Sequence, residues 1–508
     1  MGLAAQASGR AANAEKLAAA LERQSLEFGA GPAALANIAK LRGGARAVVT
    51  GQQVGLLGGP LYVLLKAATA IARAKQATAA TGVEHVPVFW LATEDHDLEE
   101  VDQVSLLTKT GIEKLSLDAK IPHHDVPVGG VVLRDAVEGL VDQASELLGH
   151  APVCELLREC YGAGATFGGA FARLMARLFA EQGLIVMDAA GRDFHALGAR
   201  VLRAAIEQAE EFEAALIARS GELEAAGYHA QVLVKPGASL LFLVGEVEGA
   251  KSRQALRRLP DGSWKAGAGS AASSYTTGEL LAILDEEPER LSPNALLRPV
   301  FQDAILPTTA YVGGPAEVAY FAQSAVLYEQ VLGRVTPILP RLSATLIEPA
   351  IGKVMSQHEV SLPEAMTTTE ELAQRLGARA MPIEAKRRLA AAGNALDEAV
   401  SAAEDYLGTL DKGLGKSAQV SASKMRYQMN RLRRLAATFE LHKEASLRKH
   451  AEAMTLHLFP DGHPQERVIA GAWFVAGFEA QGGSAEGLVA RLVDEAASQC
   501  PGHIVVRL

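Results

Sequence analysis

One stretch of the chain, residues 45–107, constrains the fold more than any other. ARAVVT predicts a short buried strand, GQQVGLLGGP a glycine-rich turn, and LYVLLKAATAIARAKQATAATG a helix that ends at Gly82. HVPVFWLA then predicts a second strand, apolar on both faces as in sheets that are covered on both sides. Two buried strands joined by a helix are the pattern of a parallel βαβ unit. We therefore expect an α/β fold with a parallel sheet as its core.

The rest of the chain adds further core segments and a separate helical part. FARLMARLFAEQGLIVMDAA predicts a helix, a glycine stop and another buried strand. GYHAQVLVKPGASLLFLVGE instead predicts an antiparallel hairpin that turns at Pro236-Gly237, inserted on the parallel sheet. We predict five segments: residues 1–107 as the first part of the core, 108–290 as its continuation with connecting insertions, 291–365 as a second core block, 366–458 as a helical coiled-coil hairpin, and 459–508 as a return to the core.

The helical hairpin is predicted from two sets of residues spaced by seven. They are Leu389, Leu396, Ala403 and Leu410 in the first arm, and Met425, Leu432 and Phe439 in the second. The stretch GTLDKGLGKSAQ between them predicts the turn, so the arms pack as an antiparallel coiled coil. Arms of roughly 30 residues would extend about 45 Å at 1.5 Å per residue. An arm of that length cannot bury both faces on itself, which favours a homodimer through the coiled coil.

Composition narrows the functional class. The formal net charge is −10, so the clustered Lys and Arg that bind nucleic acid without sequence preference are not expected. No run approaches the roughly 18 apolar residues of a membrane span, and the alanine-rich start of the chain does not read as a secretory signal. Cys154, Cys160 and Cys500 match no zinc or redox spacing, so we expect free thiols and no transition metal. A soluble cytoplasmic protein that binds neither nucleic acid nor membranes is predicted.

The glycine-rich turn between the first strand and its helix is a candidate ligand site. Gly51, Gly55, Gly58 and Gly59 precede the helix, where backbone N–H groups and the helix dipole favour anions. The spacing is not that of a dinucleotide-binding fingerprint, and the lysine of a phosphate-binding loop does not follow the glycines. A merely tight turn is the alternative. Two adjacent amides, Gln52-Gln53, have no packing reason to stand there, so a ligand site is favoured.

A cluster of charged residues follows the second strand without a spacer. It consists of Glu94, Asp95, His96 and Asp97. In open parallel sheets ligands bind beyond the carboxyl ends of the strands, so this cluster and the glycine-rich turn should lie side by side. Crowded carboxylates raise at least one pKa or recruit a cation, and Mg²⁺ with nucleotide phosphates needs only one or two of them. A solvated acidic loop is the alternative; we favour a catalytic cluster, without deciding which of the four is the base.

A third group of polar residues occupies a stretch that Pro and Gly interrupt. It comprises Arg298, Gln302, Asp303, Tyr311, Glu317, Tyr320 and Gln323, of which we predict that Arg298, Gln302, Tyr311, Glu317 and Gln323 bind substrate or nucleotide. Gly313-Gly314-Pro315 predicts a second tight turn before a helix. Arg298 is suited to bind a carboxylate through two parallel hydrogen bonds. A structural ion pair between Arg298 and Glu317 is an equally open alternative.

Taken together and in order, these motifs resemble one family. VVTGQQVGLLGGPLYVLLKA, VPVFWLATEDHD, SPNALLRPVFQDAILPTTAYVGGPAEVAYFAQ and LPRLSATLIE are similar to the cysteine ligase of bacillithiol biosynthesis, the BshC family, and the likeness extends over nearly the whole chain. The resemblance implies a Rossmann-like, nucleotidyltransferase-like core and a coiled coil that mediates dimerisation. It implies addition of cysteine to glucosaminyl-malate, with an adenine nucleotide able to bind near the coiled coil. It also implies that Gln53, Gly55, Gly58, Gly59, Asp95 and His96 line the core pocket.

Amide formation from cysteine requires an activated carboxylate, because a free carboxylate is a poor electrophile. We expect ATP or another adenine nucleotide to supply this activation, through an acyl-adenylate or acyl-phosphate. The glycine-rich turn would hold phosphate or carboxylate, while Asp95 or His96 removes a proton from the sugar amine. Two alternatives stay open: a nucleotidyl- or acyl-transferring enzyme that acts on another small amine, and a non-catalytic nucleotide-sensing dimer.

Overall fold

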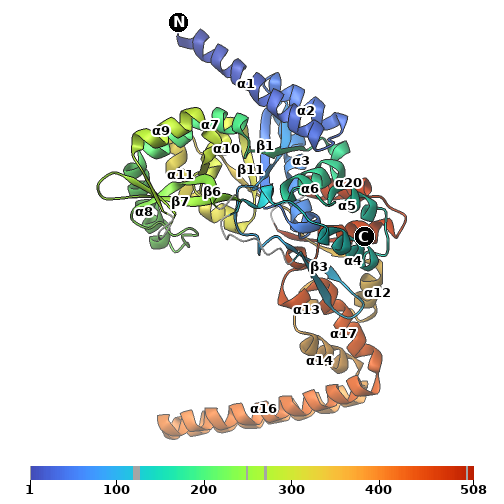
Figure 1. Ribbon diagram of the computed structural model, residues 1–508. Helices are drawn as coiled ribbons and strands as arrows, with labels where there is room; N and C mark the ends of the chain where they lie inside the picture. The colour runs from blue at the N-terminus through green and yellow to red at the C-terminus, as the bar shows by residue number, and fades with distance from the viewer. Residues whose placement is uncertain (1, 118–125, 248–249, 268–271, 499–501) are drawn as a thin grey trace. The chain divides into compact units, whose positions relative to one another are not determined.

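The computed structural model describes residues 2–117, 126–247, 250–267, 272–498 and 502–508, with side chains from residue 12 onward except at residues 247 and 250. The chain forms two compact units (Figure 1). The first comprises residues 1–108, 113–344 and 469–504, and the second residues 109–112, 345–468 and 505–508. Among the described helices none is long and apolar enough to cross a membrane.

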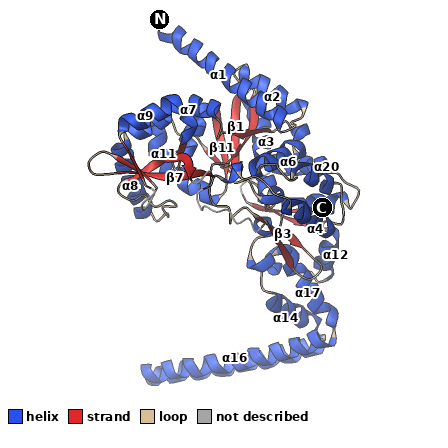
Figure 2. Cartoon of the chain, viewed as in Figure 1, coloured by secondary structure: helices blue, strands red, loops and turns tan. Residues whose placement is uncertain are grey.

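A five-stranded parallel sheet forms the centre of the first unit (Figure 2). In spatial order its strands are β12 (Ile338–Pro340), β11 (Thr308–Gly313), β1 (Arg46–Gln52), β2 (His85–Leu91) and β5 (Ile185–Asp188). All neighbouring pairs are parallel. Strand β2 is buried at every residue. The predicted α/β fold and the βαβ unit of residues 45–107 are confirmed.

Helices cover both faces of this sheet. Along β1, Val48 packs with Ala70 and Ala74 of α3, whereas Ala47 and Val49 belong to the large core cluster of the opposite face. The first unit contains α1 (Gly2–Glu27), α2 (Pro32–Arg42), α3 (Tyr62–Thr81), α4 (Ala136–Leu147), α5 (Val153–Cys160), α6 (Phe167–Leu178), α7 (Arg192–Glu207), α8 (Ala209–Ala225), α9 (Thr277–Glu286), α10 (Arg298–Ile305), α11 (Pro315–Leu332), α19 (Gly471–Glu479) and α20 (Ala485–Ser498). Cys154 and Cys160 are buried free thiols, and Cys500 lies outside the described residues.

The inserted segment forms a separate antiparallel sheet. In spatial order its strands are β10 (Leu291–Pro293), β6 (Ala238–Val247), β7 (Ala250–Arg258), β8 (Trp264–Ala266) and β9 (Ser273–Tyr275). Two further strand pairs are β3 (Gln103–Leu107) with β4 (Ile112–Ser116), and β13 (Ser343–Ile347) with β14 (His503–Arg507).

The predicted hairpin turn at Pro236-Gly237 is wrong. Strand β6 begins only at Ala238, and its hairpin partner is β7. Residues 228–237 form no strand, and at Val232 a side chain stands where a neighbouring strand would pair. The Val232 N–H donates to Gln323 Oε1 at 2.8 Å, and Gln323 Nε2 donates to the Val232 carbonyl at 2.9 Å. This pair of bonds satisfies a peptide unit that would otherwise need a ladder partner.

The second unit is helical. It contains α12 (Pro349–Gln357), α13 (Leu362–Ala365), α14 (Thr369–Ala380), α15 (Ile383–Leu410), α16 (Lys412–Lys443), α17 (Ala445–Leu458) and α18 (Gln465–Val468). Ile351 of α12 and Leu362 of α13 share one core with Met454 of α17. For this reason the boundary predicted between residues 365 and 366 lies between 344 and 345, and the one predicted between 458 and 459 lies between 468 and 469.

The tip of the predicted hairpin is tighter than expected. Only Asp411 separates α15 from α16, and its side chain accepts hydrogen bonds from the N–H groups of Gly413 and Leu414. The predicted twelve-residue turn is wrong because its glycines continue the helices. A Cβ at Gly415 would lie 3.0 Å from the Gly408 Cα, so the two helices approach closely at this end.

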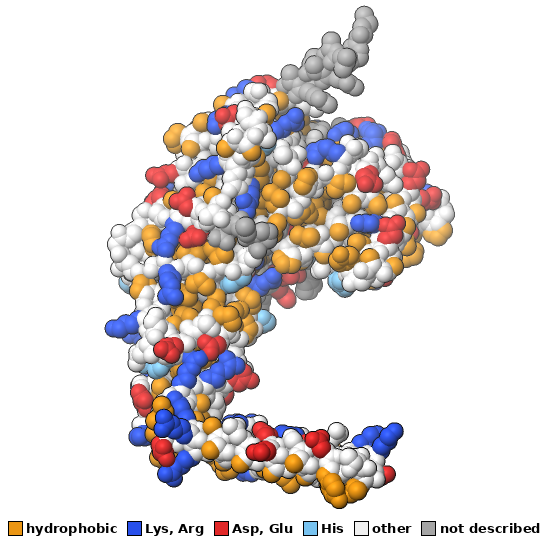
Figure 3. All heavy atoms as spheres, turned by 180° about the vertical axis from the view of Figure 1, so that it is seen from behind, with side chains coloured by type: hydrophobic (Ala, Val, Ile, Leu, Met, Phe, Trp, Pro, Cys, Tyr) orange, Lys and Arg blue, Asp and Glu red, His pale blue; other side chains and the backbone are white. Residues whose placement is uncertain are grey.

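The seven-residue spacing locates the contact seam only in part. Leu389 and Leu396 are half-buried in the seam of α15, but Leu410 and the three predicted positions of α16 are 50–65% exposed. The buried residues of α16 are instead Ala422, Met429, Ala437 and Leu441. The helix therefore carries an outer apolar face, which we define as Leu414, Met425, Leu432, Leu435 and Phe439. Hydrophobic side chains are visible along the hairpin at the bottom of Figure 3.

Candidate functional site

The two motifs that follow β1 and β2 lie side by side. Because these strands are parallel, their carboxyl ends meet at one edge of the sheet. Gln53 Nε2 donates to Asp95 Oδ2 at 2.8 Å, and the Ala92 N–H donates to the Gln52 carbonyl at 3.0 Å. Gln53 also donates to Glu100 at 2.8 Å. The glycine-rich turn and the charged cluster thus share one edge, as the sequence predicts.

The glycine-rich turn is buried and hydrogen-bonded internally. Gly58 and Gly59 have φ of 89° and 71°, which glycine adopts without strain. The Gly58 N–H donates to the Gly55 carbonyl and lies 3.2 Å from the Tyr161 hydroxyl, while the Gly59 N–H donates to the Leu56 carbonyl. The Gly58 and Gly59 N–H groups thus have partners within the protein, and the expectation that the turn holds a phosphate or carboxylate stays a prediction. The turn shapes the site, and Tyr161 supports it.

Lys66 of α3 is a buried cation beside the glycine-rich turn. No motif in the sequence singled out this lysine. It is 2% exposed, and its Nζ lies 2.5 Å from Glu317 Oε2, 2.7 Å from the Gly51 carbonyl and 3.0 Å from Gln52 Oε1. Burial lowers the pKa of Lys66, and Glu317 opposes this effect. The available signal was a single lysine inside the apolar run LYVLLKAATAIA. Gln52 also donates to the Tyr62 hydroxyl at 3.1 Å, so its amide is held by the protein itself.

The third predicted group forms a polar network at the end of β11. Glu317 accepts from the Tyr311 hydroxyl at 2.6 Å and from the Gly314 N–H at 2.7 Å. Arg298 donates to Gln302 at 3.0 Å and to the Tyr320 hydroxyl at 2.8 Å. The structure thus shows no Arg298–Glu317 ion pair within the described residues, since the cation beside Glu317 is Lys66.

Gln323 stands apart from this network. Its side chain is fully buried, and its amide binds both the Val232 peptide group and the Ser220 hydroxyl. All of its described contacts are within the protein. The predicted ligand contact at Gln323 therefore gives way to a structural role, which is to hold residues 228–237 in place.

The four residues of the charged cluster point in different directions. Glu94 faces inward, with Oε1 3.3 Å from Nε2 of the fully buried His195. Burial alone would raise the pKa of Glu94, but the positive charges of His195 and Arg253 and a hydrogen bond from Ser292 together lower it. The pKa of His195 is raised by Glu94, although burial opposes this. Glu94 is therefore held as an anion by buried cations.

The other three members of the cluster are more accessible. The side chains of Asp95 and His96 are 36% and 38% exposed. Asp95 Oδ1 accepts from the His96 N–H at 2.8 Å, which leaves both carboxylate oxygens fixed but open to further contacts. Asp97 is exposed and accepts from the Glu100 N–H at 3.3 Å, as a loop-capping residue does. Asp95 and His96 are the two members that a small molecule can approach.

Two further charged residues reach this edge from segments far away in the sequence. Asp188, at the end of β5, accepts from the Thr93 hydroxyl at 2.5 Å, and burial raises its pKa. Its position directly after the strand LIVM was a usable signal. Arg253 of β7 lies with Nη1 3.4 Å from His96 Nδ1. No local pattern marks Arg253, because only the folding of the inserted sheet brings it here.

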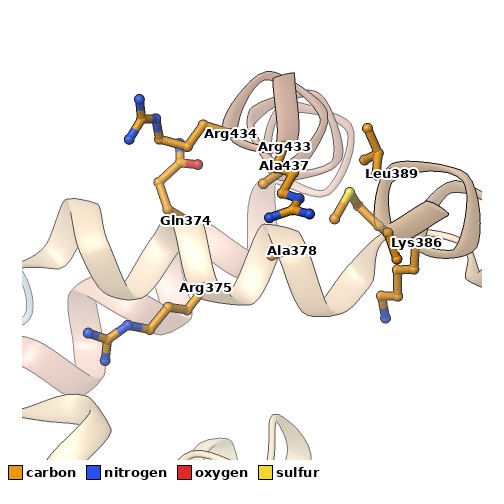
Figure 4. Close-up of a pocket in the computed structure, with 10 residues that line it drawn as sticks. Gln374, Arg375, Ala378, Lys386, Leu389, Arg433, Arg434 and Ala437 are labelled. Atoms are coloured by element: carbon orange, nitrogen blue, oxygen red, sulfur yellow. The ribbon is translucent and has the colours of Figure 1, made fainter. Parts of the chain in front are cut away.

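The second unit has a pocket of its own, of about 400 Å³, among α14, α15 and α16 (Figure 4). Apolar side chains and four cations line it: Gln374, Arg375, Ala378, Met381, Lys386, Leu389, Ala390, Arg433, Arg434 and Ala437. Arg433 lies directly over Gly393, where a Cβ would meet its Nη2 at 2.0 Å. Gln374 Oε1 is buried without a hydrogen-bond partner among the described residues. No group of three His, Cys, Asp or Glu side chains in the described part of the chain is arranged to hold a metal ion.

The architecture and the polar edge define a class: a Rossmann-like α/β protein joined to a C-terminal coiled coil. Comparison with known families specifies it further. Residues 3–342 match the Rossmann-like N-terminal domain, and residues 344–481 the C-terminal coiled-coil domain, of the bacillithiol biosynthesis protein BshC. The chain belongs to the BshC family.

Relatives named "Putative cysteine ligase BshC" align over most of their length. The protein of Koribacter versatilis is 43% identical over 97% of this chain and 90% of its own. Those of Solibacter usitatus and Salinibacter ruber are 34% and 32% identical, over 91% and 92% of this chain and 84% and 85% of their own. The family assignment made from the motifs is confirmed.

Proposed function

We propose that this protein is a ligase that joins the carboxyl group of cysteine to the amine of glucosaminyl-malate in bacillithiol synthesis. Family membership supports the reaction class. The observation that carries the site assignment is the contact between Gln53 and Asp95, which fixes an accessible carboxylate at the edge of the sheet. This is the position at which open α/β sheets bind their ligands.

The geometry favours Asp95 as the general base. As the amine nitrogen forms its bond to the cysteine carbonyl carbon, the bond from that carbon to the leaving oxygen breaks, and one proton must leave the nitrogen. Glu94 is poorly suited to take it, because its side chain is only 18% exposed and lies against the buried His195. Asp97 is exposed and caps a loop. Asp95 is accessible and oriented by Gln53, and His96 beside it is suited to contact the substrate.

An adenine nucleotide, when bound, would supply the leaving group that activates the cysteine carboxylate. As a separate site for an adenine nucleotide we propose the pocket of the second unit, where Lys386 and Arg433 offer charge to phosphates and Leu389 offers an apolar wall. The unpartnered Gln374 Oε1 is an acceptor that suits an amino group. Mg²⁺ with nucleotide phosphates would need only one or two carboxylates, which the charged cluster at the sheet edge offers and the described lining of this pocket does not, so we include Mg²⁺ in the proposal only at that edge.

The outer apolar face of α16 supports a homodimer through the coiled coil. Its five side chains are 42–65% exposed along one side of a long helix. Contiguous apolar surface of this kind is typical of protein interfaces. A second copy would cover the face in the way that heptad-spaced side chains pack between helices.

The proposed site is tested by Asp95→Asn in a bacillithiol-producing host that lacks its own copy of the gene, with thiol profiling. We expect loss of bacillithiol and accumulation of glucosaminyl-malate, while thermal unfolding of the purified variant stays unchanged. Glu99→Gln is the matched control, because Glu99 is an exposed neighbour in the same loop. Normal bacillithiol in the Asp95→Asn strain would overturn the assignment of the base. Accumulation of a different amine in the deletion strain would favour transfer to another substrate.

A further inference from the structure

Arg253 is a buried guanidinium whose described close contacts include no carboxylate. It is 7% exposed and reaches from β7 across β6 to β10. Its Nε donates to the Ser292 hydroxyl at 3.1 Å, and its Nη2 donates to the Pro293 carbonyl at 2.9 Å. Its Cζ lies 3.8 Å from the centre of the Phe242 ring, within the range of a cation–π contact. The side chain is thus fixed on three sides.

The charge of this side chain is left without a direct counter-ion. Across the described residues, no carboxylate oxygen lies within 4.0 Å of the Arg253 guanidinium. Glu94 and Asp95 act on it only at longer range, and the close partner of Glu94 is His195. Charged side chains are rarely buried without an ionic partner, because desolvation of an unpaired charge is costly. A group that brings a negative charge would complete the arrangement.

We propose that Arg253 binds a carboxylate of the substrate and thereby positions it against Asp95 and His96. Nη1 is the part of the guanidinium that faces the cluster, 3.4 Å from His96 Nδ1, and its second N–H remains for a ligand. The role depends on arginine, since the planar fork can bind both oxygens of a carboxylate. This inference rests on the proposed function, whose substrates carry carboxylates at two places: the malate part and cysteine itself.

The inserted sheet gains a function from this assignment. The parallel sheet supplies the base at the end of β2, and the antiparallel sheet supplies the positive charge from β7. Ser292 and Pro293 set the orientation of that charge from β10. Substrate orientation would thus depend on a segment about 160 residues away from the charged cluster.

Calorimetric titration of the full-length protein with L-malate and, separately, with L-cysteine tests the proposal and identifies the source of the carboxylate. We expect Arg253→Gln to weaken binding of one of them by about 10- to 100-fold, the range expected for loss of a charge-assisted pair. Arg253→Lys should restore part of the affinity. Arg257→Gln is the matched control, because Arg257 lies on the same strand and is exposed. Unchanged thermal unfolding of the variants shows that the fold persists.

The outcomes separate this inference from the proposed function. Equal affinity of Arg253→Gln and wild-type protein for both ligands would overturn the role of Arg253, as would wild-type protein that binds neither. Carboxylate binding that depends on Arg253, in a protein whose deletion leaves bacillithiol intact, would preserve the inference and reject the proposed function. Loss of bacillithiol in an Arg253→Gln strain, together with weakened binding, would support both.

Discussion

Replacement of Lys66 by methionine should destabilise the first unit strongly. The substitution keeps the volume of the stem but removes a charge that is 2% exposed and contacts Glu317, the Gly51 carbonyl and Gln52. Removing one partner of a buried ion pair costs about 3–5 kcal/mol, because the other charge stays buried. In Lys66→Met/Glu317→Gln both charges are gone, and the remaining cost is about 1–2 kcal/mol for acceptors left without donors. The two substitutions should therefore be coupled by about 2 kcal/mol or more.

Urea denaturation followed by tryptophan fluorescence measures this coupling in the first unit of the fold, where Lys66 and Glu317 lie. The three tryptophans of the chain, Trp90, Trp264 and Trp473, all belong to the first unit. Lys75→Met is the control, since Lys75 lies on the same helix and is exposed; it should change stability by no more than about 0.5 kcal/mol. A double variant as unstable as the sum of the single ones would refute the buried-pair reasoning, and so would a Lys66→Met protein that matches the control.

Two further predictions concern pH and assembly. The folded-state pKa of His195 is raised above its ordinary value of 6.5, so the contribution of its charge to folding stability is complete below pH 6.5 and is lost as the pH rises through the folded-state pKa. His195→Gln should therefore cost more stability at pH 6 than at pH 9 in the same urea assay. An equal cost at both pH values would contradict the charged pair. The double variant Leu432→Ser/Phe439→Ser should shift the protein from dimer to monomer in sedimentation velocity. Ser423→Asn is the control and should not, because Ser423 is exposed and lies outside the outer apolar face. A double variant that stays dimeric would place the interface elsewhere.

The sequence predicted the parts of the fold that depend on neighbouring residues, above all the βαβ unit. The apolar runs of β1 and β2 and the stop at Gly82 define the βαβ unit, and strand order then places Gln53 beside Asp95. The heptad spacing found the hairpin but not its seam, because several residues spaced by seven face outward. Met425, which is seven residues from Leu432, is exposed, whereas Ala422 and Met429, also seven apart, are buried.

The missed residues are those whose surroundings come from distant segments. Lys66 appears in the sequence as one polar residue in an apolar helix, and its counter-ion Glu317 is 251 residues away. Arg253 lies in a strand with basic residues on both sides, and only pairing among β10, β6 and β7 buries it. The partners of the glycine-rich turn could not be predicted for a related reason: Tyr161, which lies beside the Gly58 N–H, comes from a segment about 100 residues away.

The single residue between α15 and α16 ties the rotation of one helix to that of the other. With only Asp411 as a connection, one residue inserted near the tip of α16 would turn Leu432 and Phe439 together by about 100° relative to the seam with α15. Length changes that keep the pairing must therefore come as whole heptads, added to both arms at once. The length of the hairpin can therefore change only in steps of one heptad, or roughly 10 Å.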